Sequence, residues 1–396
     1  MIPEKGGGIL KQIRESEFSF EKLGKSYPEL DRLRGVLQNP DYHAEGDVYQ
    51  HTKLVCQKLM LHPDWQELPD RYQELLFLSA MFHDVGKIAC TKFQDGAWTS
   101  PKHAIVGEQE FRRLVYREAD RFGLLWEERE MVAKLIRYHG LPVWFFSKRR
   151  PEYDMIKAAE SIPMRLLYLL SRADAKGRRG TSRENLIEHV ELFADYAKEL
   201  GIWEGPYNFS SPYTKFEYFR RLDMWQGADL YDKTSFEVIL MSGLPLSGKD
   251  TWIAEHGEGR IVISLDDIRE EFGISPSKKS DKVVQIAMER ARKLLRKKEP
   301  FIWNGTNLIQ ETRQRLMRVF ADYGARVHIV YVEAPYKELY KRNQKRERYI
   351  PENVLERMID KLEIPAPWEA YKVRVIQGGI SSKETSENYI EEISNI

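Results

Sequence analysis

Hydrophobic residues recur every three or four positions between about residues 46 and 202, which is the spacing of amphipathic helices. Val48 and Leu59 bound one such segment, with Leu54 and Val55 between them. Further segments with this pattern lie at 75–82, 104–122, 127–139, 155–176 and 183–200. No alternating strand pattern stands out in this half of the sequence, so we predict that it is all-α.

The segment 203–234 breaks this periodicity, because Pro206, Pro212 and Gly227 interrupt it among many aromatic residues. We predict an irregular connection here and a domain boundary near 230–235. Beyond it, short apolar runs alternate with helical segments, which is typical of the βαβ units of a parallel sheet. These runs lie at 236–241, 260–264, 301–303 and 327–332.

The length of 396 residues exceeds what one hydrophobic core usually organises. We therefore predict an N-terminal extension at 1–40, an all-α domain with its irregular connector at 41–232, and a parallel-sheet domain at 233–396. The fold class is α plus α/β in two domains.

The composition indicates an ordinary soluble globular protein, with 42% hydrophobic and 31% charged residues. Lys and Arg number 62 against 61 for Asp and Glu, so net charge says nothing about nucleic acid. The N-terminal residues lack the order of a secretory signal and no apolar run reaches membrane-spanning length, so we expect a cytoplasmic protein without a membrane partner. Cys56 and Cys90 lack the spacing of a disulfide framework or a zinc-thiolate site.

A glycine loop follows the first predicted strand of the second half and precedes a predicted helix. It runs from Gly243 through Ser247 and Gly248 to Lys249. Small residues let backbone N–H groups close around phosphates, and the lysine reaches the terminal phosphates. The alternative is a glycine turn without a ligand, but the strand and helix context favours binding of ATP or another NTP.

The residue after Lys249 departs from the usual pattern. Ser or Thr at this position ordinarily ligates Mg²⁺, whereas this chain has Asp250, with Thr251 one step later. A carboxylate here either holds Mg²⁺ directly or repels the donor phosphates. We take Asp250 as a candidate Mg²⁺ ligand and Thr251 as a candidate nucleotide contact.

Two further segments supply candidate catalytic residues for phosphoryl transfer. Asp266 follows the second predicted strand, where a carboxylate can accept a proton from an attacking hydroxyl. Arg269, one helical turn later, can hold an acceptor phosphate. Arg342 and Arg346 lie four residues apart on one predicted helix face, which suits a lid over the donor phosphates but also an ordinary solvated face.

Together these segments resemble the 5′-hydroxyl polynucleotide kinases of the phage type over nearly all of residues 236–365. The resemblance implies that Asp266 is the general base for the 5′-OH, that Arg269 contacts the acceptor's 3′-phosphate, and that Arg342 and Arg346 contact the donor. Where that family often has an Asp shortly before a Thr-Asn pair, this chain has Asn304-Gly305.

Six of the nine histidines fall within residues 43–139. His51 opens one predicted helix, the pair His83-Asp84 ends another, and Asp174 lies on a third. Imidazole nitrogens and carboxylates from separate helices can enclose a transition metal and leave room for water and a phosphate oxygen. A lone histidine is more often a core residue, but an adjacent His-Asp pair is hard to explain by packing alone.

This arrangement resembles the HD-domain phosphohydrolase superfamily over about residues 40–200. His103 and His139 fall where its two-metal members place two additional histidines. The resemblance implies one or two divalent transition metals (Mn, Ni, Co or similar), with Lys87 as a phosphate contact. His43 either lines the site or caps a helix.

Basic residues gather in three places. Lys148-Arg149-Arg150 and Arg178-Arg179 lie beside proposed metal ligands, and a run from Lys278 to Lys298 crowds one predicted helix of the second half. Contacts of such residues to phosphates supply most non-specific affinity for nucleic acid, although a solvated helix face is the commoner meaning of a charge run.

The order of the two halves resembles bacterial bifunctional end-healing enzymes that pair an HD 2′,3′-phosphatase with a polynucleotide kinase. That resemblance implies removal of 2′,3′-cyclic or 3′-phosphates by the first half and NTP-dependent phosphorylation of 5′-OH ends, with Mg²⁺, by the second. The partners are then RNA or DNA strand ends and, downstream, a separate ligase.

Two alternatives remain open. The chain is either a nucleotide phosphohydrolase fused to a kinase of a small metabolite, or a non-catalytic nucleotide or nucleic-acid sensor, for which Asp250 is the motive. Activity on oligonucleotide ends and its dependence on Lys249 and Asp266 discriminate among these functions.

Overall fold

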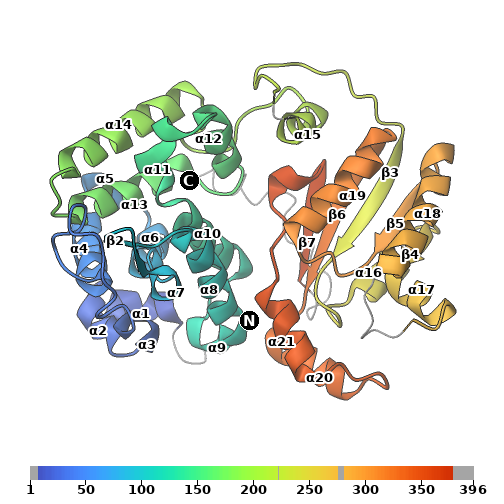
Figure 1. The fold of residues 1–396 in the computed structure, drawn as a ribbon, viewed down its shortest axis with the longest axis horizontal. Coiled ribbons are helices and arrows are strands. Elements are labelled where there is room, and N and C mark those ends of the chain that lie inside the picture. Colours follow the sequence, from blue (N-terminus) through green and yellow to red (C-terminus); the bar gives the residue numbers. More distant parts are fainter. Residues whose placement is uncertain (1–7, 222, 275–280, 378–396) are drawn as a thin grey trace. The chain divides into compact units, whose positions relative to one another are not determined.

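The computed structural model describes residues 8–221, 223–274 and 281–377. Its contacts divide the chain into two compact units, one running to Asn208 and a second that begins at Phe209. The first is helical and the second contains a parallel sheet, so the predicted order of a helical half followed by a βαβ half is confirmed (Figure 1).

The helical unit packs its longest helices against one another. Helix α4 (Val48–Met60) contacts α6 (Asp70–Phe82) and α13 (Met164–Gly177), and α10 (Trp126–Tyr138) contacts α6 and α8 (His103–Arg117). The remaining elements are α1 (Ile9–Glu15), α2 (Phe20–Gly24), α3 (Pro28–Asp31), α5 (Pro63–Gln66), α7 (Lys87–Cys90), α9 (Ala119–Phe122), α11 (Leu141–Trp144), η1 (Phe145–Ser147), α12 (Pro151–Ala159) and α14 (Arg183–Glu199). Helix α6 is buried almost all round, as expected for a central helix.

The prediction that this half is all-α was wrong at one place. Strands β1 (Lys92–Gln94) and β2 (Ala97–Thr99) form a short antiparallel hairpin. Asp95 and Gly96 connect them with φ values of 53° and 80°, the positive values that a tight hairpin turn requires. Strands of three residues are too short to show an alternating pattern, but the Asp-Gly dipeptide was the available signal.

The residues expected as an N-terminal extension contribute to the helical unit. Helix α1 packs on α6, and the side chains of Ile9, Leu10 and Ile13 are buried. Arg14 adds a polar contact to this packing, because its Nε donates to Glu74 Oε1 at 2.6 Å.

The sheet unit has five parallel strands in the order β4-β5-β3-β6-β7. The strands are β3 (Phe236–Ser242), β4 (Ile261–Ser264), β5 (Phe301–Asn304), β6 (Ala325–Glu333) and β7 (Lys372–Gln377). The helices are α15 (Pro212–Arg220), α16 (Lys249–His256), α17 (Leu265–Glu271), α18 (Asp281–Lys297), α19 (Gln310–Asp322), α20 (Tyr336–Gln344), α21 (Glu352–Asp360) and η2 (Pro367–Glu369). Strand β7, which the sequence pattern did not indicate, extends the sheet beside β6.

The segment predicted as an irregular connection contains a helix, α15, whose first turn begins with Pro212. Ser211 caps it by accepting a hydrogen bond from the Thr214 N–H at 3.0 Å. Phe216 is buried in the core of the sheet unit, which explains why the structure groups this segment with the second unit.

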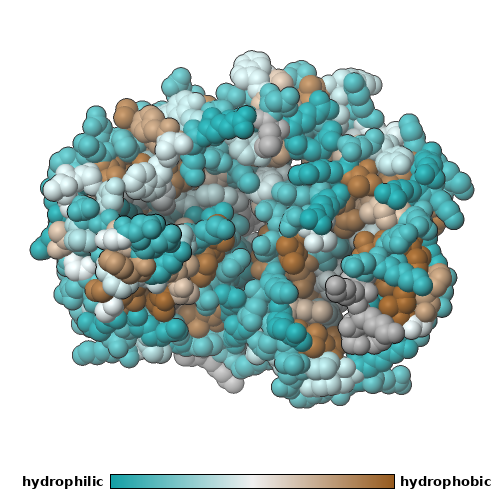
Figure 2. All heavy atoms as spheres, viewed as in Figure 1, coloured by the Kyte–Doolittle hydropathy of each residue, from teal (hydrophilic) through white to brown (hydrophobic). Residues whose placement is uncertain are grey.

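The surface of the molecule is mainly hydrophilic in the view of Figure 2, with apolar patches of limited size. This agrees with the predicted composition class. Among the residues that the structure describes, no helix has both the length and the apolar character needed to cross a membrane.

A buried ion pair organises the loops at one end of the sheet unit. Arg313 on α19 is fully buried, and its Nε and Nη2 donate to the Glu369 carboxylate at 2.7 and 2.9 Å. Its Nη1 donates to the carbonyls of Asn307, Leu308 and Glu363 at 3.1, 3.0 and 2.8 Å. One guanidinium therefore ties the turn after β5 to the segment that leads into β7.

We predict that Arg313→Ala destabilises the sheet unit by about 3–5 kcal/mol, because it leaves Glu369 buried without its cation. Hydrogen exchange of peptides from 301–322 measures this loss of protection. Arg315→Ala on the same helix is the control, since Arg315 pairs with Glu311 in solvent and should cost at most about 0.5 kcal/mol. Equal effects of the two substitutions would contradict the organising role.

Candidate functional site

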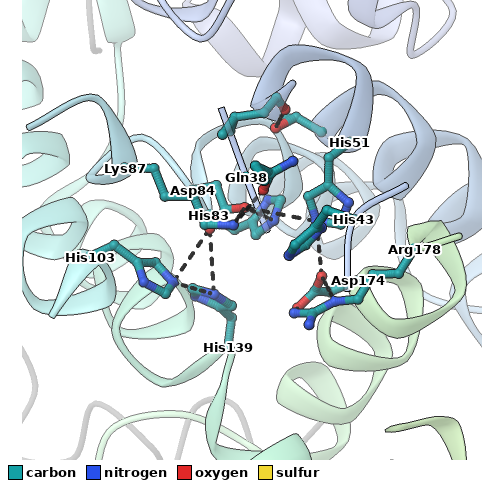
Figure 3. A network of polar contacts seen from close by, with 12 residues as sticks. Gln38, His43, His51, His83, Asp84, Lys87, His103, His139, Asp174 and Arg178 are labelled. Carbon is teal, nitrogen blue, oxygen red and sulfur yellow. Dashed lines mark hydrogen bonds and ion pairs between the residues drawn. The ribbon is translucent and has the colours of Figure 1, made fainter. Parts of the chain in front are cut away.

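The helical unit brings together all six residues predicted as metal ligands (Figure 3). They are His51 on α4, His83 and Asp84 directly after α6, His103 at the start of α8, His139 directly after α10, and Asp174 on α13. Five are buried and the His103 side chain is 27% exposed, so the cluster lies inside the unit with one edge open.

Asp84 lies between two sets of ligand atoms. Its Oδ2 is 3.2 Å from His83 Nε2 and 3.8 Å from His51 Nε2. Its Oδ1 is 3.4 Å from His103 Nε2 and 3.8 Å from His139 Nε2. Two sets of three residues each have ligand atoms within 4.8 Å of one another. One set is His51, His83 and Asp174, and the other is Asp84, His103 and His139. One carboxylate thus faces both sets.

Backbone carbonyls fix three of the four rings. The Nδ1–H of His83, His103 and His139 each donates, at 2.8 Å, to the carbonyl three residues earlier. A carbonyl can only accept, so Nδ1 of each ring carries a proton, and Nε2 of each ring faces Asp84. His83 Nε2 is buried and lies 3.2 Å from Asp84 Oδ2, an arrangement in which both atoms can bind one cation.

The fourth ring, His51, is held by carboxylates on both sides. Its Nε2 lies 3.0 Å from Asp174 Oδ1, and its Nδ1 lies 2.7 Å from Glu45 Oε1. Arg178 in turn donates to the Asp174 carboxylate at 3.2 and 2.9 Å. The same Glu45 oxygen lies 2.8 Å from His43 Nδ1, so Glu45 orients both histidines.

Glycine is required at position 86, two residues after the His-Asp pair. A Cβ there would lie 2.1 Å from the His103 carbonyl oxygen and 2.5 Å from the Gly107 nitrogen. Any side chain would push α8 away and carry His103 out of reach of Asp84. Close packing against α8 therefore explains the glycine, Gly86, that follows His83-Asp84 in the sequence.

The electrostatics of the cluster hold the pKa values of Asp84 and Asp174 well below their usual range, whereas burial lowers the pKa values of His103 and His139. Burial alone would also lower the pKa of His83, but the neighbouring Asp84 raises it. Burial alone would raise the pKa of Asp84, but Lys87 and the surrounding histidines hold it well below its usual range. Burial lowers the pKa of His139 to about 3, with help from the neighbouring histidines. Neutral imidazoles and ionised carboxylates are the forms that bind metal ions.

A cavity of about 680 Å³ opens beside this cluster and is lined by His43, Lys87, His103 and His139. Lys87 Nζ lies 2.8 Å from Asp84 Oδ2 and donates to Gln38 Oε1 at 2.7 Å. Of the two roles considered for His43, the structure gives it the lining one, because Asp47 caps α4.

The predicted phosphate loop joins β3 to α16 and has the backbone such a loop needs. Gly243 and Gly248 have φ values of 141° and 110°. A Cβ on Gly243 would lie 2.3 Å from the Val332 carbonyl oxygen, so only glycine fits there. Ser247 is buried, and its Oγ forms no hydrogen bond within the described residues.

Lys249 is folded back onto this loop. Its Nζ donates to the carbonyls of Gly243 and Leu244 at 3.1 and 2.8 Å. Burial lowers the pKa of Lys249 to about 8, although the charges of Asp250 and Asp266 act in the opposite direction. Keeping the Lys249 ammonium charged therefore costs folding free energy until an anion approaches it.

Asp250 is exposed and accepts a hydrogen bond from Asn304 Nδ2 at 2.8 Å. Asn304 is the last residue of β5, the strand beside β3. Thr251 is exposed on the first turn of α16. Asp250, which stands where P-loops usually have a hydroxyl residue, therefore contacts Asn304. Asn304 lies where the polynucleotide kinases that this segment resembles often have an aspartate.

The remaining predicted kinase residues lie on two helices. Asp266 is exposed on α17, and Arg269 on the same helix has a buried Nη1 without a hydrogen bond to described residues. Arg342 on α20 reaches the phosphate loop, because its Nη1 donates to the Leu246 carbonyl at 2.9 Å. Arg346 is exposed, and its charge acts on Lys249.

Sequence reasoning missed several residues of these sites. Gln38 and the Asp250–Asn304 contact carry no motif, since their partners lie 49 and 54 residues away in the chain. Glu45 carries no motif either, although its partner His51 lies only six residues later. Arg178 and Lys148 were noted only as basic residues, and both line the cavity. Of the basic run in the second half, Lys278 and Lys279 lie outside the described residues.

We predict that Lys249→Met stabilises the nucleotide-free protein by about 1–3 kcal/mol at pH 7, since each pKa unit corresponds to about 1.4 kcal/mol. Folding lowers the pKa of this lysine, so between pH 8 and 10.5 the unfolded chain holds a proton that the folded chain has lost. The gain is therefore full below pH 8 and disappears as the pH rises toward 10.5.

Urea denaturation between pH 7 and 10 measures this difference, followed by hydrogen exchange in the sheet unit. Lys345→Met, at an exposed position after α20, is the matched control and should change stability little at any pH. A Lys249→Met protein less stable than the wild type at pH 7 would contradict the cost assigned to its burial.

Comparison with known proteins adds to this geometry. Residues 238–365 match the family model AAA_33, described as an AAA domain. The chain is 26% identical over 166 residues to L-seryl-tRNA(Sec) kinase of Methanococcus maripaludis, covering 40% of this chain and 65% of that protein. It is 34% identical over 166 residues to the multifunctional CCA protein of Alkalilimnicola ehrlichii, covering 40% and 36%.

A third relative is the bifunctional uridylyltransferase/uridylyl-removing enzyme of Cereibacter sphaeroides, 29% identical over 173 residues, or 39% of this chain and 17% of that protein. The chain spans less than two thirds of each of these relatives. A solved structure, Chaetomium thermophilum Kti12 in complex with ADP-AlF3, aligns with a TM-score of 0.30 and 16% identity over 40% of this chain and 95% of its own, a likeness too small to carry an argument. Residues 238–365 form a P-loop domain of the kinase-like AAA type, which supports nucleotide-dependent phosphorylation in general.

Proposed function

We propose that this chain heals broken nucleic-acid strands with two activities. The helical unit removes 2′,3′-cyclic, 3′- or 2′-phosphates from strand ends, and the sheet unit phosphorylates 5′-OH ends with an NTP. The observation that carries the proposal is the cluster around Asp84, in which histidine Nε2 atoms from four places in the chain converge at the edge of a cavity.

The donor set of the cluster suits divalent transition metals such as Mn, Ni or Co, because imidazole nitrogens and carboxylate oxygens are ligands these ions accept. His51, His83 and Asp174 would hold one ion, and Asp84, His103 and His139 would hold a second. Bound metal supplies Lewis-acid activation of water and of the phosphate. Lys87 adds a fixed positive charge at the edge of the cavity, where it binds a phosphate oxygen.

In the sheet unit, the γ-phosphate passes in line to the 5′-OH of the strand. Asp266 accepts the proton of that hydroxyl, and Lys249 turns from the loop carbonyls to the terminal phosphates of the donor. Arg269, whose buried Nη1 has no partner within the described residues, holds the acceptor's phosphate. Arg342 and Arg346 close over the donor, and Mg²⁺ is held at Asp250.

The name of one relative supports this class of substrate, because it is a kinase of L-seryl-tRNA(Sec). Asp250 motivates the competing assignment of a sensor without catalysis, whereas no described feature favours a phosphohydrolase and kinase of free metabolites over an enzyme of strand ends.

We predict that the purified chain, with ATP and Mn²⁺, Ni²⁺ or Co²⁺, processes both ends of an RNA that carries a 5′-OH and a 3′-phosphate. His83→Ala lowers 3′ release by at least about 10²-fold with 5′ transfer intact, because loss of a residue that only orients a metal ligand costs about 10–100-fold and loss of a ligand costs at least as much. Lys249→Ala and Asp266→Ala abolish 5′ transfer and leave 3′ release intact. End-labelled RNA resolved on gels measures both reactions.

His62→Ala is the control for loss of a histidine, since His62 caps α5 and lies outside the cluster. If only free nucleotides and metabolites are processed, the strand assignment is wrong. If neither reaction occurs with any of the metals, the sensor is the better explanation.

A further inference from the structure

The cavity beside the Asp84 cluster is larger and more basic than a terminal phosphate requires. Pockets of about 300–1,000 Å³ enclose whole drug-sized ligands, and this one measures about 680 Å³. Six cationic side chains and one carboxylate line it: Lys87, Lys102, Arg137, Lys148, Lys157, Arg178 and Asp154. A ligand with several negative charges fits such a lining.

Two of these cations, Lys102 and Lys148, form no ion pair with any described residue. Lys87 and Arg178 are paired with Asp84 and Asp174, and Arg137 lies 3.5 Å from Glu108. Lys102 and Lys148 are exposed. Lys102 also has a φ of 60°, a strained conformation for a lysine, directly before His103.

Aromatic side chains line the same cavity. Trp144 is 45% exposed, and Trp98 on β2 packs edge-on against Phe93 at a ring distance of 5.2 Å. Trp98 is half-buried and Trp144 is exposed. Accessible indole rings beside unpaired cations are the combination that binds single-stranded nucleic acid, where bases stack on aromatic rings and cations follow the backbone.

We propose that this cavity binds the last two or more nucleotides of a single strand. Trp98 and Trp144 stack on its bases, and Lys102 and Lys148 contact the phosphodiester that precedes the terminal phosphate. The inference rests on the proposed hydrolase function and defines its substrate class, an unpaired strand end as opposed to a mononucleotide.

The test measures 3′-phosphate release by the full chain from a nucleoside 3′-monophosphate and from 3′-phosphorylated strands of two, three and six nucleotides. A 5′-phosphate on each strand excludes the kinase reaction. We expect KM to fall about tenfold or more between one and two nucleotides, which is the size of one stacking contact.

Trp98→Ala and Trp144→Ala should each raise KM for the strands about tenfold. Lys148→Ala should also raise KM and lower the slope of log KM against log salt by about 0.7, the value for one phosphate contact on a single strand. The matched controls are Trp225→Ala and Lys58→Ala, at exposed positions that do not line the cavity.

Equal kcat/KM for the mononucleotide and the strands would overturn this inference and leave the hydrolase function standing. No release from any of the substrates would overturn both. Since Lys148 is exposed, its variant tests the inference even if a tryptophan variant does not fold.

A second inference comes independently from the Asp250–Asn304 contact. In P-loop enzymes a hydroxyl after the lysine and a separate aspartate together hold Mg²⁺. Here the first position is a carboxylate and the residue at the end of the neighbouring strand is an amide, and the two side chains meet at 2.8 Å. We infer that the charged and the neutral ligand of Mg²⁺ have exchanged positions. The carboxylate, Asp250, now follows the lysine, and the neutral ligand, Asn304, ends the neighbouring strand, so the site keeps one negative charge.

Exchange variants test this arrangement. Asp250→Ser alone should weaken Mg²⁺-dependent ATP binding about tenfold or more, and Asn304→Asp added to it should restore most of the loss. Calorimetric titration of ATP with and without Mg²⁺ measures the affinity, independently of kinase activity. A double variant no better than Asp250→Ser, or an Asp250→Ser protein that binds like the wild type, would overturn the exchange.

Discussion

The helical unit depends on a carboxylate, Asp84, that is ionised in its interior. A buried charge of this kind is tolerated only with compensating partners, and Lys87 and the surrounding imidazoles provide them. Those partners come from α6, α7, α8 and α10, so the charge also fixes how these helices meet. Gly86 lets α8 approach closely enough for His103 to take part.

In the sheet unit, close backbone packing fixes how the elements of the site meet. The phosphate loop is set by the glycine at 243 and by the carbonyl of Val332 on the neighbouring strand β6. Arg313 holds the turn after β5 through the carbonyls of Asn307 and Leu308, and Asn307 donates to the Met241 carbonyl at 2.7 Å. Loop and turn are therefore rigid relative to each other, while the functional lysine is kept folded back at a cost to stability.

The sequence allowed prediction of the elements whose signal is local. The phosphate loop, the His-Asp pair and the main strands each follow from residues close together in the chain. The hairpin at 92–99 was missed because its strands are too short for a pattern, and α15 because aromatic residues hide its periodicity. Contacts such as His51 with Asp174, 123 residues apart, or Gln38 with Lys87, 49 residues apart, depend on the tertiary fold, and there only the resemblance to a known family pointed to the first of them.

The contact between Asp250 and Asn304 has a consequence for the evolution of such loops. With one cation shared between these two positions as we propose, they are expected to covary although they lie 54 residues apart, so that a carboxylate at one accompanies a neutral residue at the other. A motif that demands a hydroxyl immediately after the lysine would classify this domain as degenerate. Scoring the two positions jointly would instead separate true losses of activity from rearrangements that conserve charge.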